Sequence, residues 1–515
     1  MGLRQVAIHL MKNDITRECR MTHDILIRHG MVIDGTGAKR FQADIALDGD
    51  RIAAIGDLRD RAARIEIDAT GCIVAPGFID AHAHDDIALL AEPDMPSKVS
   101  QGCTTVVIGN CGFSAAPLTP RASYPDDFLL GDESYYRFPR VADYFAALRE
   151  TPAAVNAAAL VGHSVLRVEC MGELDRPANA GEIAAMGARL REALADGALG
   201  FSTGLEYPSN KAADTDEVVA LARVAGEMGA VYTTHSRNYD AQFREALLEA
   251  LEIGQRAEVP VVLSHHQGDG PENVGHTAWS LPMIDEARGS QLVGLDVYPY
   301  NAAATIIDPA FVLSASKVLI SSSQPHPEMA GRELDDIARE WGIDRDAAAL
   351  KLAPGGAIYF CQDEADVQRI LAFPPTMIGS DGLPGGEINH PRLWGSFPRV
   401  LGHYSRDLEL FDLETAIHKM TGLTASRFGL IDRGKLAVGA YADVTVFDPE
   451  TVIDRATFAK PSEPSLGIRF VAVNGALVWR DGIATGARPG RPLPRQTRLA
   501  PQSLSSLKPL QLAAF

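Results

Sequence analysis

Five segments of the chain end in residues that can bind a metal ion or carry a proton, and in each segment a short apolar run comes before the terminal residue. The segments are Phe78–His84, Val106–Cys111, Val231–His235, Val261–His265 and Thr376–Asp381. Their imidazole, thiolate and carboxylate groups are typical zinc ligands. In a parallel barrel the carboxyl ends of the strands lie on one face, where residues distant in sequence can meet. We therefore expect a zinc site at these strand ends.

The first two segments carry His82, His84 and Cys111. Residues i and i+2 of an extended strand point to the same side, so both histidines can face one metal ion. A free cysteine is more often a buried core residue, and a nucleophile is a second alternative. The neighbouring Gly109 and Gly112 at a strand end favour a ligand for Cys111.

The other three segments supply His235, His265 and Asp381. The two histidines end candidate strands about thirty residues apart, as successive barrel strands would, and we predict that both bind metal. An aspartate beside a glycine is usually a turn residue, but Asp381 follows an apolar run and could act as general base. Arg392 lies soon after it and could bind a substrate carboxylate through paired hydrogen bonds, with a surface ion pair as the alternative.

The elements needed to position these residues are those of a (β/α)8 barrel. Three further candidate strands lie at 156–163, 198–204 and 292–298, which makes eight with the five above. Helical periodicity predicts helices over Ala180–Asp196, Asp214–Met228 and Asp240–Ala257. The predicted fold is an α/β TIM barrel.

Both ends of the chain contain short alternating strands separated by turn residues. We expect residues 23–75 and 430–485 to form one small β-sandwich beside a barrel over 76–429. An insertion at about 305–372 lies between strands seven and eight, and a loop of that length on the catalytic face is typical of a lid or specificity element. Residues 1–22 and 486–515 are expected to be extensions, the second one loosely packed.

The composition of the chain restricts the kinds of molecule that the protein can bind. The 515 residues carry a net charge of −19, from 48 Lys and Arg against 67 Asp and Glu, which argues against nucleic acid or an anionic membrane as partner. No apolar run is long enough to span a bilayer. The six cysteines show no C-x-x-C pairing, so a reducing, cytoplasmic location is expected. The oligomeric state stays open.

Taken together the motifs resemble the D-aminoacylase or N-acyl-D-amino-acid deacylase family of the amidohydrolase superfamily over residues 24–485. The motifs that carry the resemblance are Gly77–Asp86, Gly102–Gly112, Leu160–Arg167, Gly200–Pro208, Thr234–Asn238, Ser264–His266, Asp296–Tyr300, Gly379–Pro384 and His390–Tyr404. Many amidohydrolases bridge two metals with a carboxylated lysine of strand four. The fourth candidate strand here offers no lysine, and by the resemblance a cysteine of strand two takes the metal.

The resemblance implies zinc-dependent hydrolysis of N-acyl-D-amino acids to a D-amino acid and a carboxylate. It implies a tight zinc site formed by Cys111, His235 and His265, and a weaker or partly vacant second site at His82 and His84. By the same resemblance Asp381 is the general acid and base, and Tyr298 and Arg392 hold the substrate α-carboxylate.

One residue departs from the family pattern. Members that prefer acidic side chains carry a lysine just after the His-His pair, where this chain has Gln267. Because a neutral amide does not favour a second carboxylate as an ammonium does, we expect neutral or hydrophobic side chains to be preferred. The alternatives are a cyclic amide hydrolase of the hydantoinase or dihydroorotase kind, and a scaffold that kept the barrel without catalysis.

Overall fold

The structure is a computed structural model that describes residues 22–128, 131–386, 388–496 and 499. The expected N-terminal extension 1–22 lies outside the described residues except for Thr22, and so does most of the C-terminal extension beyond residue 496. No helix of the described part is long and apolar enough to cross a membrane.

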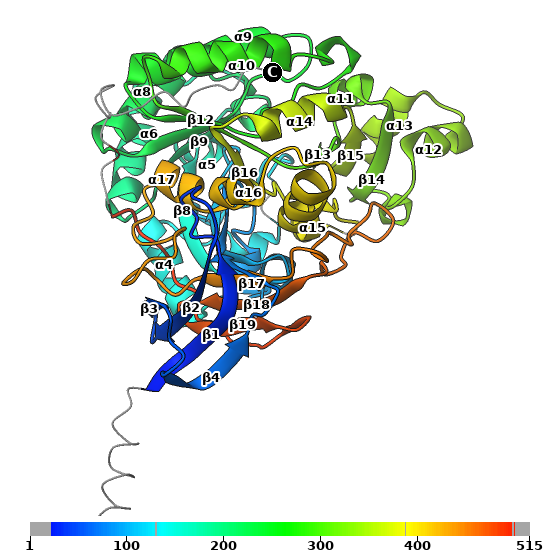
Figure 1. Cartoon of the computed structure of the whole chain (residues 1–515). Coiled ribbons are helices and arrows are strands. Elements are labelled where there is room, and N and C mark those ends of the chain that lie inside the picture. The colour runs from blue at the N-terminus through cyan, green and yellow to red at the C-terminus, as the bar shows by residue number, and fades with distance from the viewer. Residues whose placement is uncertain (1–21, 129–130, 387, 497–498, 500–515) are drawn as a thin grey trace, which may run out of the picture.

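Eight parallel strands form the barrel at the centre of Figure 1, in one continuous hydrogen-bonded order. They are β6 (Phe78–Asp80), β7 (Cys103–Ile108), β8 (Asn156–Gly162), β9 (Gly200–Gly204), β10 (Val231–His235), β11 (Val261–Leu263), β12 (Val293–Val297) and β16 (Thr376–Ile378). Their residues are buried throughout, as expected for strands covered on both faces. The eight predicted strands are therefore confirmed.

The barrel closes between its first and last strands. The amide of Ala81 donates to the carbonyl of Ile378 (3.1 Å), and the amide of Asp381 donates to the carbonyl of His82 (2.8 Å). A parallel bridge also joins Ala83 to Gly382. Closure places the segments after β6 and β16 side by side, although about 300 residues separate them in sequence.

Helices surround the barrel (Figure 1). They are α4 (Val141–Glu150), α5 (His163–Cys170), α6 (Ala180–Ala195), α8 (Thr215–Glu227), α9 (Phe243–Ala257), α10 (Thr277–Arg288), α14 (Glu364–Ala372), α15 (Arg392–Arg399), α16 (Leu413–Met420) and α17 (Gly422–Phe428). Asn179 and Glu182 form a capping box that starts α6, and Asp214 caps α8. The three helices predicted from periodicity are confirmed.

Strands from 22–76 and 444–484 pair in a second sheet, the terminal sheet, at the bottom of Figure 1. Its N-terminal strands are β1 (Thr22–Val32), β2 (Phe41–Asp48), β3 (Arg51–Gly56), β4 (Ala62–Asp68) and β5 (Ile73–Pro76). Its C-terminal strands are β17 (Val444–Phe447), β18 (Ile468–Val473), β19 (Ala476–Arg480) and β20 (Ile483–Ala484). β17 pairs with β5, so all nine strands share one continuous sheet with an apolar core of its own.

The segment between β12 and β16 contains a small unit with its own core. Its three-stranded antiparallel sheet consists of β13 (Ala303–Ile306), β14 (Lys317–Ser323) and β15 (Gly355–Phe360), in the order β13-β15-β14. Two helices, α12 (Leu334–Trp341) and α13 (Arg345–Leu352), pack with it. This unit lies to one side of the barrel, away from the sheet of the two termini (Figure 1).

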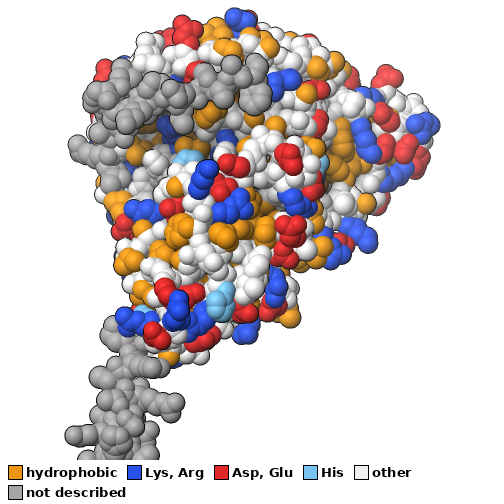
Figure 2. All heavy atoms as spheres, viewed as in Figure 1, with side chains coloured by type: hydrophobic (Ala, Val, Ile, Leu, Met, Phe, Trp, Pro, Cys, Tyr) orange, Lys and Arg blue, Asp and Glu red, His pale blue; other side chains and the backbone are white. Residues whose placement is uncertain are grey.

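The described part of the C-terminal extension is packed, contrary to the expected loose tail. Ala157 of β8 donates its amide to the carbonyl of Arg491 (3.0 Å) and accepts a hydrogen bond from the amide of Leu493 (2.7 Å). The physical reason is that β8 pairs with β7 from Asn156 but with β9 only from Leu160, so the backbone groups of Ala157 are free on the β9 side. On the face in Figure 2, basic and acidic side chains are intermixed.

Candidate metal centre and substrate cavity

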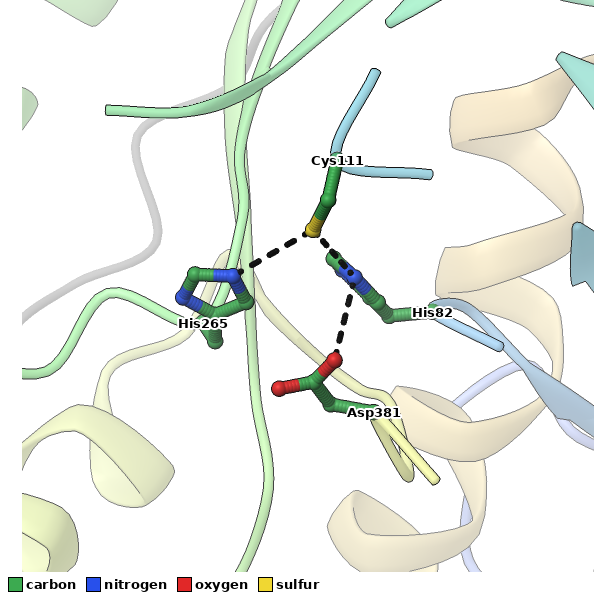
Figure 3. A group of neighbouring side chains, drawn as sticks. All are labelled: His82, Cys111, His265 and Asp381. Carbon is green, nitrogen blue, oxygen red and sulfur yellow. Dashed lines mark hydrogen bonds and ion pairs between the residues drawn. The ribbon is translucent and has the colours of Figure 1, made fainter. Parts of the chain in front are cut away.

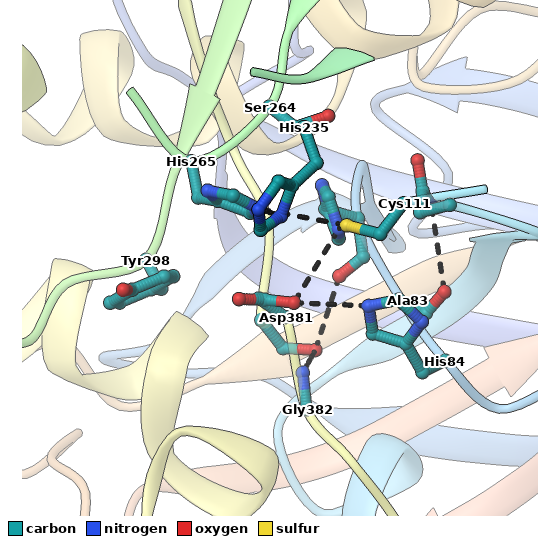
Figure 4. A network of polar contacts seen from close by, with 12 residues as sticks. Ala83, His84, Cys111, His235, Ser264, His265, Tyr298, Asp381 and Gly382 are labelled. Carbon is teal, nitrogen blue, oxygen red and sulfur yellow. Dashed lines mark hydrogen bonds and ion pairs between the residues drawn. The ribbon is translucent and has the colours of Figure 1, made fainter. Parts of the chain in front are cut away.

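Each predicted metal ligand lies at or just beyond the carboxyl end of a barrel strand. His235 is the last residue of β10, and His265 follows β11 by two residues. Cys111 and Asp381 follow β7 and β16 by three residues each. These side chains, with those of His82 and His84, are at most 8% exposed. Figure 4 shows the side chains of His84, Cys111, His235, His265 and Asp381 converging on one point.

The thiol of Cys111 lies at the centre of the group. Its Sγ is 3.2 Å from Nε2 of His82 and 3.5 Å from Nε2 of His265. Nδ1 of His235 lies 3.1 Å from that same nitrogen of His265. Ligand atoms of His82, Cys111, His265 and Asp381 all lie within 4.8 Å of one another (Figure 3). The five side chains of the two predicted metal sites and that of Asp381 thus form one cluster.

The donor set fits zinc. Zn–S and Zn–N bonds of ordinary length in a tetrahedron separate the donor atoms by about 3.3–3.6 Å, which matches the Cys111–His265 separation of 3.5 Å. The cluster also combines a carboxylate and a thiol with several imidazoles, the donor types that zinc prefers. Residues able to hold a zinc ion are therefore already assembled.

The charges of the cluster favour the same conclusion. Burial raises the pKa of the Cys111 thiol, but the surrounding imidazoles outweigh burial and hold that pKa well below its ordinary value. Burial lowers the pKa of His235, yet Cys111 and Glu206 together raise it to about 9. The protein thus stabilises a thiolate against cationic partners, and a dication can take the place of the imidazole protons.

Asp381 contacts both the histidine cluster and an arginine. Its Oδ1 lies 3.1 Å from Nε2 of His84, and its Oδ2 lies 2.9 Å from Nη1 of Arg392. The Arg392 guanidinium stacks over the ring of Tyr298, 4.4 Å from its centroid. Asp381 therefore links the proposed metal ligands to the two residues expected to bind a substrate carboxylate.

Three of the site residues have left-handed backbone conformations. The φ angles are 53° for Cys111, 30° for His265 and 47° for Asp381. Such angles are uncommon for residues other than glycine and cost free energy, and they concentrate at functional sites. Here they turn the chain sharply beyond each strand, where the three side chains meet.

Two carboxylates that the sequence analysis did not single out, the half-buried Glu206 and the buried Asp296, orient the imidazoles. Oε2 of Glu206 lies 2.9 Å from Nε2 of His235, which leaves Nδ1 directed to the cluster. Asp296 lies 3.2 Å from Nδ1 of His82 and accepts the amide of His265 (2.9 Å). Carboxylates that hold the distal nitrogen of a histidine are typical of metal sites. The sequence feature that could have revealed these two residues is an acidic residue near the end of a barrel strand, Glu206 after β9 and Asp296 in β12.

A further carboxylate, that of Asp80, joins the first barrel strand to the segment after the last one. Oδ1 of Asp80 accepts hydrogen bonds from the amides of Ser380 (2.8 Å) and His82 (3.3 Å). Its other oxygen is 2.8 Å from Nζ of Lys98, which also donates to Oγ of Ser380 (2.9 Å). This fully buried contact fixes the two segments that carry His82 and Asp381.

A cavity reaches the cluster from the side of the insertion. His235, His265 and Asp381 line one end of it, and the remaining wall includes Gln267 and Tyr298. β13 and β15 contribute Ala303–Thr305 and Tyr359, so the insertion forms part of the wall. The structure thus brings all nine sequence-predicted site residues to one cavity or its immediate surroundings.

Comparison with known proteins agrees with this architecture. Residues 66–284 and 346–479 match the model of the amidohydrolase family. The chain belongs to this family. It is 53% identical over 473 residues to a D-aminoacylase of Alcaligenes xylosoxydans xylosoxydans, across 92% of this chain and 98% of the relative. The resemblance found in the sequence is therefore confirmed.

Two further relatives differ in the substrate that their names give. An N-acyl-D-aspartate deacylase of the same organism is 48% identical, over 91% of this chain and 95% of the relative. An N-acyl-D-glutamate deacylase of Bordetella bronchiseptica, solved with zinc and a phosphonate mimic of the tetrahedral intermediate, is 47% identical with a TM-score of 0.89. That comparison covers 92% of this chain and 100% of the solved one.

Proposed function

We propose that this protein is a zinc-dependent N-acyl-D-amino-acid deacylase, which hydrolyses a linear amide to a D-amino acid and a carboxylate such as acetate. The observation that carries the proposal is the position of Asp381 between the Cys-His cluster and Arg392. A general base and residues of a candidate metal site thus line one cavity, and a group that can bind carboxylates lies directly beside it, in contact with Asp381 and Tyr298. Three relatives of similar length act, by their names, on such D-amino-acid substrates.

Cys111, His235 and His265 would hold the zinc ion, with His82 and His84 available for a weaker second one. When bound, zinc lowers the pKa of water toward about 7 and polarises the amide carbonyl. Three protein ligands leave the open coordination position that catalysis requires.

The protein's own groups supply the proton transfers. Asp381 takes a proton from water as the water oxygen attacks the acyl carbon, and then gives it to the amine nitrogen as the C–N bond breaks. Its left-handed backbone and its contact with His84 fix the direction of the carboxylate. Water and amide are therefore converted to a carboxylate and an amine without a covalent enzyme intermediate.

Arg392 would bind the α-carboxylate of the substrate. Its Nη2 donates to the carbonyl of Ala304 (3.0 Å), while its buried Nε has no hydrogen-bond acceptor among the described residues. A substrate carboxylate would provide one and would fix which enantiomer presents its acyl carbon to the metal. Tyr298 supports the guanidinium from below. Gln267 in the cavity wall supports a preference for neutral or hydrophobic side chains.

A hydrolysis panel tests this function. Zinc-loaded protein is given N-acetyl-D-methionine, leucine, phenylalanine and glutamate, their L-enantiomers, a hydantoin and dihydroorotate. We expect turnover of the D-amides with methionine ahead of glutamate, and a loss of about 100- to 10,000-fold in kcat for Asp381→Asn at unchanged zinc content. Cleavage of the cyclic amides alone would favour the other enzyme class. Absence of both zinc and activity would favour a scaffold.

A further inference from the structure

Two glutamine amides and one carboxylate form a connected network in the cavity wall. Nε2 of Gln362 donates to Oδ1 of Asp269 (2.9 Å), and Oε1 of Gln362 faces Nε2 of Gln267 (3.2 Å). Nε2 of Gln267 also donates to the carbonyl of Tyr300 (2.8 Å). Gln267, Asp269 and Gln362 all line the cavity that reaches His235, His265 and Asp381.

Chemistry fixes the direction of every amide in this network. An ionised carboxylate and a backbone carbonyl only accept hydrogen bonds, whereas a side-chain amide has one donor end and one acceptor end. Asp269 therefore requires the nitrogen of Gln362, which directs the oxygen of Gln362 to Gln267. The carbonyl of Tyr300 requires the nitrogen of Gln267 as well. Gln362 is thus oriented from both of its ends and Gln267 from its nitrogen end, so neither amide can flip without losing a partner.

This orientation leaves one acceptor without a donor. Both N–H groups of Gln267 are engaged, and its buried Oε1 has no hydrogen-bond donor among the described residues. A buried acceptor left unpaired costs free energy, which a ligand with an N–H or O–H group can recover. Because Gln267 borders the cavity, a substrate side chain is the group placed to supply that donor.

The charges around the cavity also favour a neutral hydrogen-bond donor over a carboxylate. Its lining includes the carboxylates of Glu206, Asp269 and Asp381 and, among the described residues, no lysine or arginine. Arg392 contacts the cavity at Asp381 and Tyr298, where the substrate α-carboxylate is expected. A second carboxylate on the substrate side chain would therefore meet acceptors and negative charge, which disfavour it.

We propose that Asp269 is a positioning residue for specificity: through Gln362 it holds the Gln267 carbonyl oxygen available to the substrate side chain. The site thereby selects N-acyl-D-amino acids whose side chain ends in a hydrogen-bond donor, such as a primary amide, over their acidic isosteres. The inference rests on the proposed deacylase function and names its substrate class more narrowly. Specificity of this kind can be large, because the wrong substrate leaves buried polar groups unpaired.

The test compares two isosteric substrates. N-acetyl-D-glutamine and N-acetyl-D-glutamate differ only by NH2 against oxygen, and N-acetyl-D-methionine serves as an apolar reference of similar length. Burial raises the pKa of Asp269 to about 6, so this carboxyl group is ionised at about pH 8. We expect the kcat/KM ratio of glutamine to glutamate to be at least about 100 in the wild type.

The Asp269→Asn variant should lower this ratio about tenfold or more, because an asparagine can also donate and no longer fixes the direction of Gln362. The change should arise mainly in KM, and kcat/KM should fall by a larger factor for the glutamine substrate than for the methionine substrate, whose side chain has no donor for Gln267. The matched control is Asp126→Asn, which removes an exposed carboxylate that borders a neighbouring groove and does not line the cavity. It should leave the ratio unchanged.

The outcomes separate this inference from the function on which it rests. If Asp269→Asn does not fold, Gln267→Met removes the acceptor directly and should lower the same ratio. An unchanged ratio in a folded variant of either kind overturns the inference. Wild-type protein that cleaves the methionine substrate but treats glutamine and glutamate alike overturns the inference alone. Failure to cleave any of the three overturns the proposed function and the inference with it.

Discussion

Arg392 and Asp381 form a buried ion pair, in which Nη1 of the arginine lies 2.9 Å from Oδ2 of the aspartate. Burial favours the protonated form of Asp381, but Arg392 and the imidazoles of the cluster outweigh it and hold its pKa well below the ordinary value. The base is thus kept ionised by the group proposed to bind the substrate. A bound α-carboxylate would share Arg392 with Asp381, so that substrate binding and proton affinity are coupled.

The first prediction concerns this coupling. Arg392→Lys should lower kcat/KM by about 100-fold, because a lysine cannot form paired hydrogen bonds with a carboxylate. Replacing Arg392 by leucine should also raise the pKa of Asp381, so the acidic limb of the kcat/KM profile should move to higher pH. The profile is measured between pH 4 and 9, approximately. Arg399→Lys, on the same helix but outside the cavity, is the control, and equal effects of the two lysine variants would contradict the assignment.

The second prediction concerns the metal. Wild-type protein should keep about one zinc ion per chain through dialysis, and Cys111→Ala should keep little, because a neutral methyl group replaces the thiolate ligand. Metal analysis after gel filtration measures this, and removal of zinc by a chelator should abolish activity that added zinc restores. Cys72→Ala, at a buried cysteine of the terminal sheet, should retain full zinc. Normal zinc content in Cys111→Ala would refute its role as ligand.

The third prediction concerns Glu206, which holds the distal nitrogen of His235. Glu206→Gln should weaken zinc binding by about 10- to 100-fold, because the carboxylate both orients the imidazole and increases its basicity. Competition with a chromophoric chelator gives the zinc Kd. Glu173→Gln, at the rim of a neighbouring groove, provides the comparison. A zinc Kd unaffected by Glu206→Gln would mean that His235 needs no such partner.

The fourth prediction concerns the contact between the terminal sheet and the barrel. The Arg40 guanidinium lowers the pKa of Glu414 to about 2, and the two side chains are 2.8 Å apart. A depressed folded-state pKa gives stability that is present above the unfolded-state pKa, about 4.5, and is lost as pH falls toward 2. Glu414→Gln should therefore cost about 1–2 kcal/mol at neutral pH, allowing for solvent screening at the exposed arginine.

Thermal unfolding at several pH values checks this. The Tm difference between wild type and Glu414→Gln should shrink as pH falls below about 4.5. Glu450→Gln, at an exposed position, should change the stability by less than about 0.5 kcal/mol throughout. A Tm difference that does not depend on pH would show that the ion pair contributes nothing.

The sequence by itself determined the barrel and the residue types of its site. Strands buried on both faces appear in the sequence as short continuous apolar runs, and helices with an apolar stripe appear as periodic patterns. A metal-ligating residue at the end of such a strand can be recognised in the same way, as with His235 at the end of β10. The association of the segments 23–75 and 430–485 was likewise expected, because both are rich in short strands and enclose an α/β middle.

The tertiary structure decided how these residues contact one another. The contact of His84 with Asp381 spans 297 positions and exists only because the barrel closes between β6 and β16. The roles of Glu206 and Asp269 depend on which atom faces which partner, and no periodicity encodes that. Hydrogen-bond direction follows from the position of every neighbouring donor and acceptor. The physical reason is that burial is a local pattern of residue types, whereas polar geometry is a property of the assembled site.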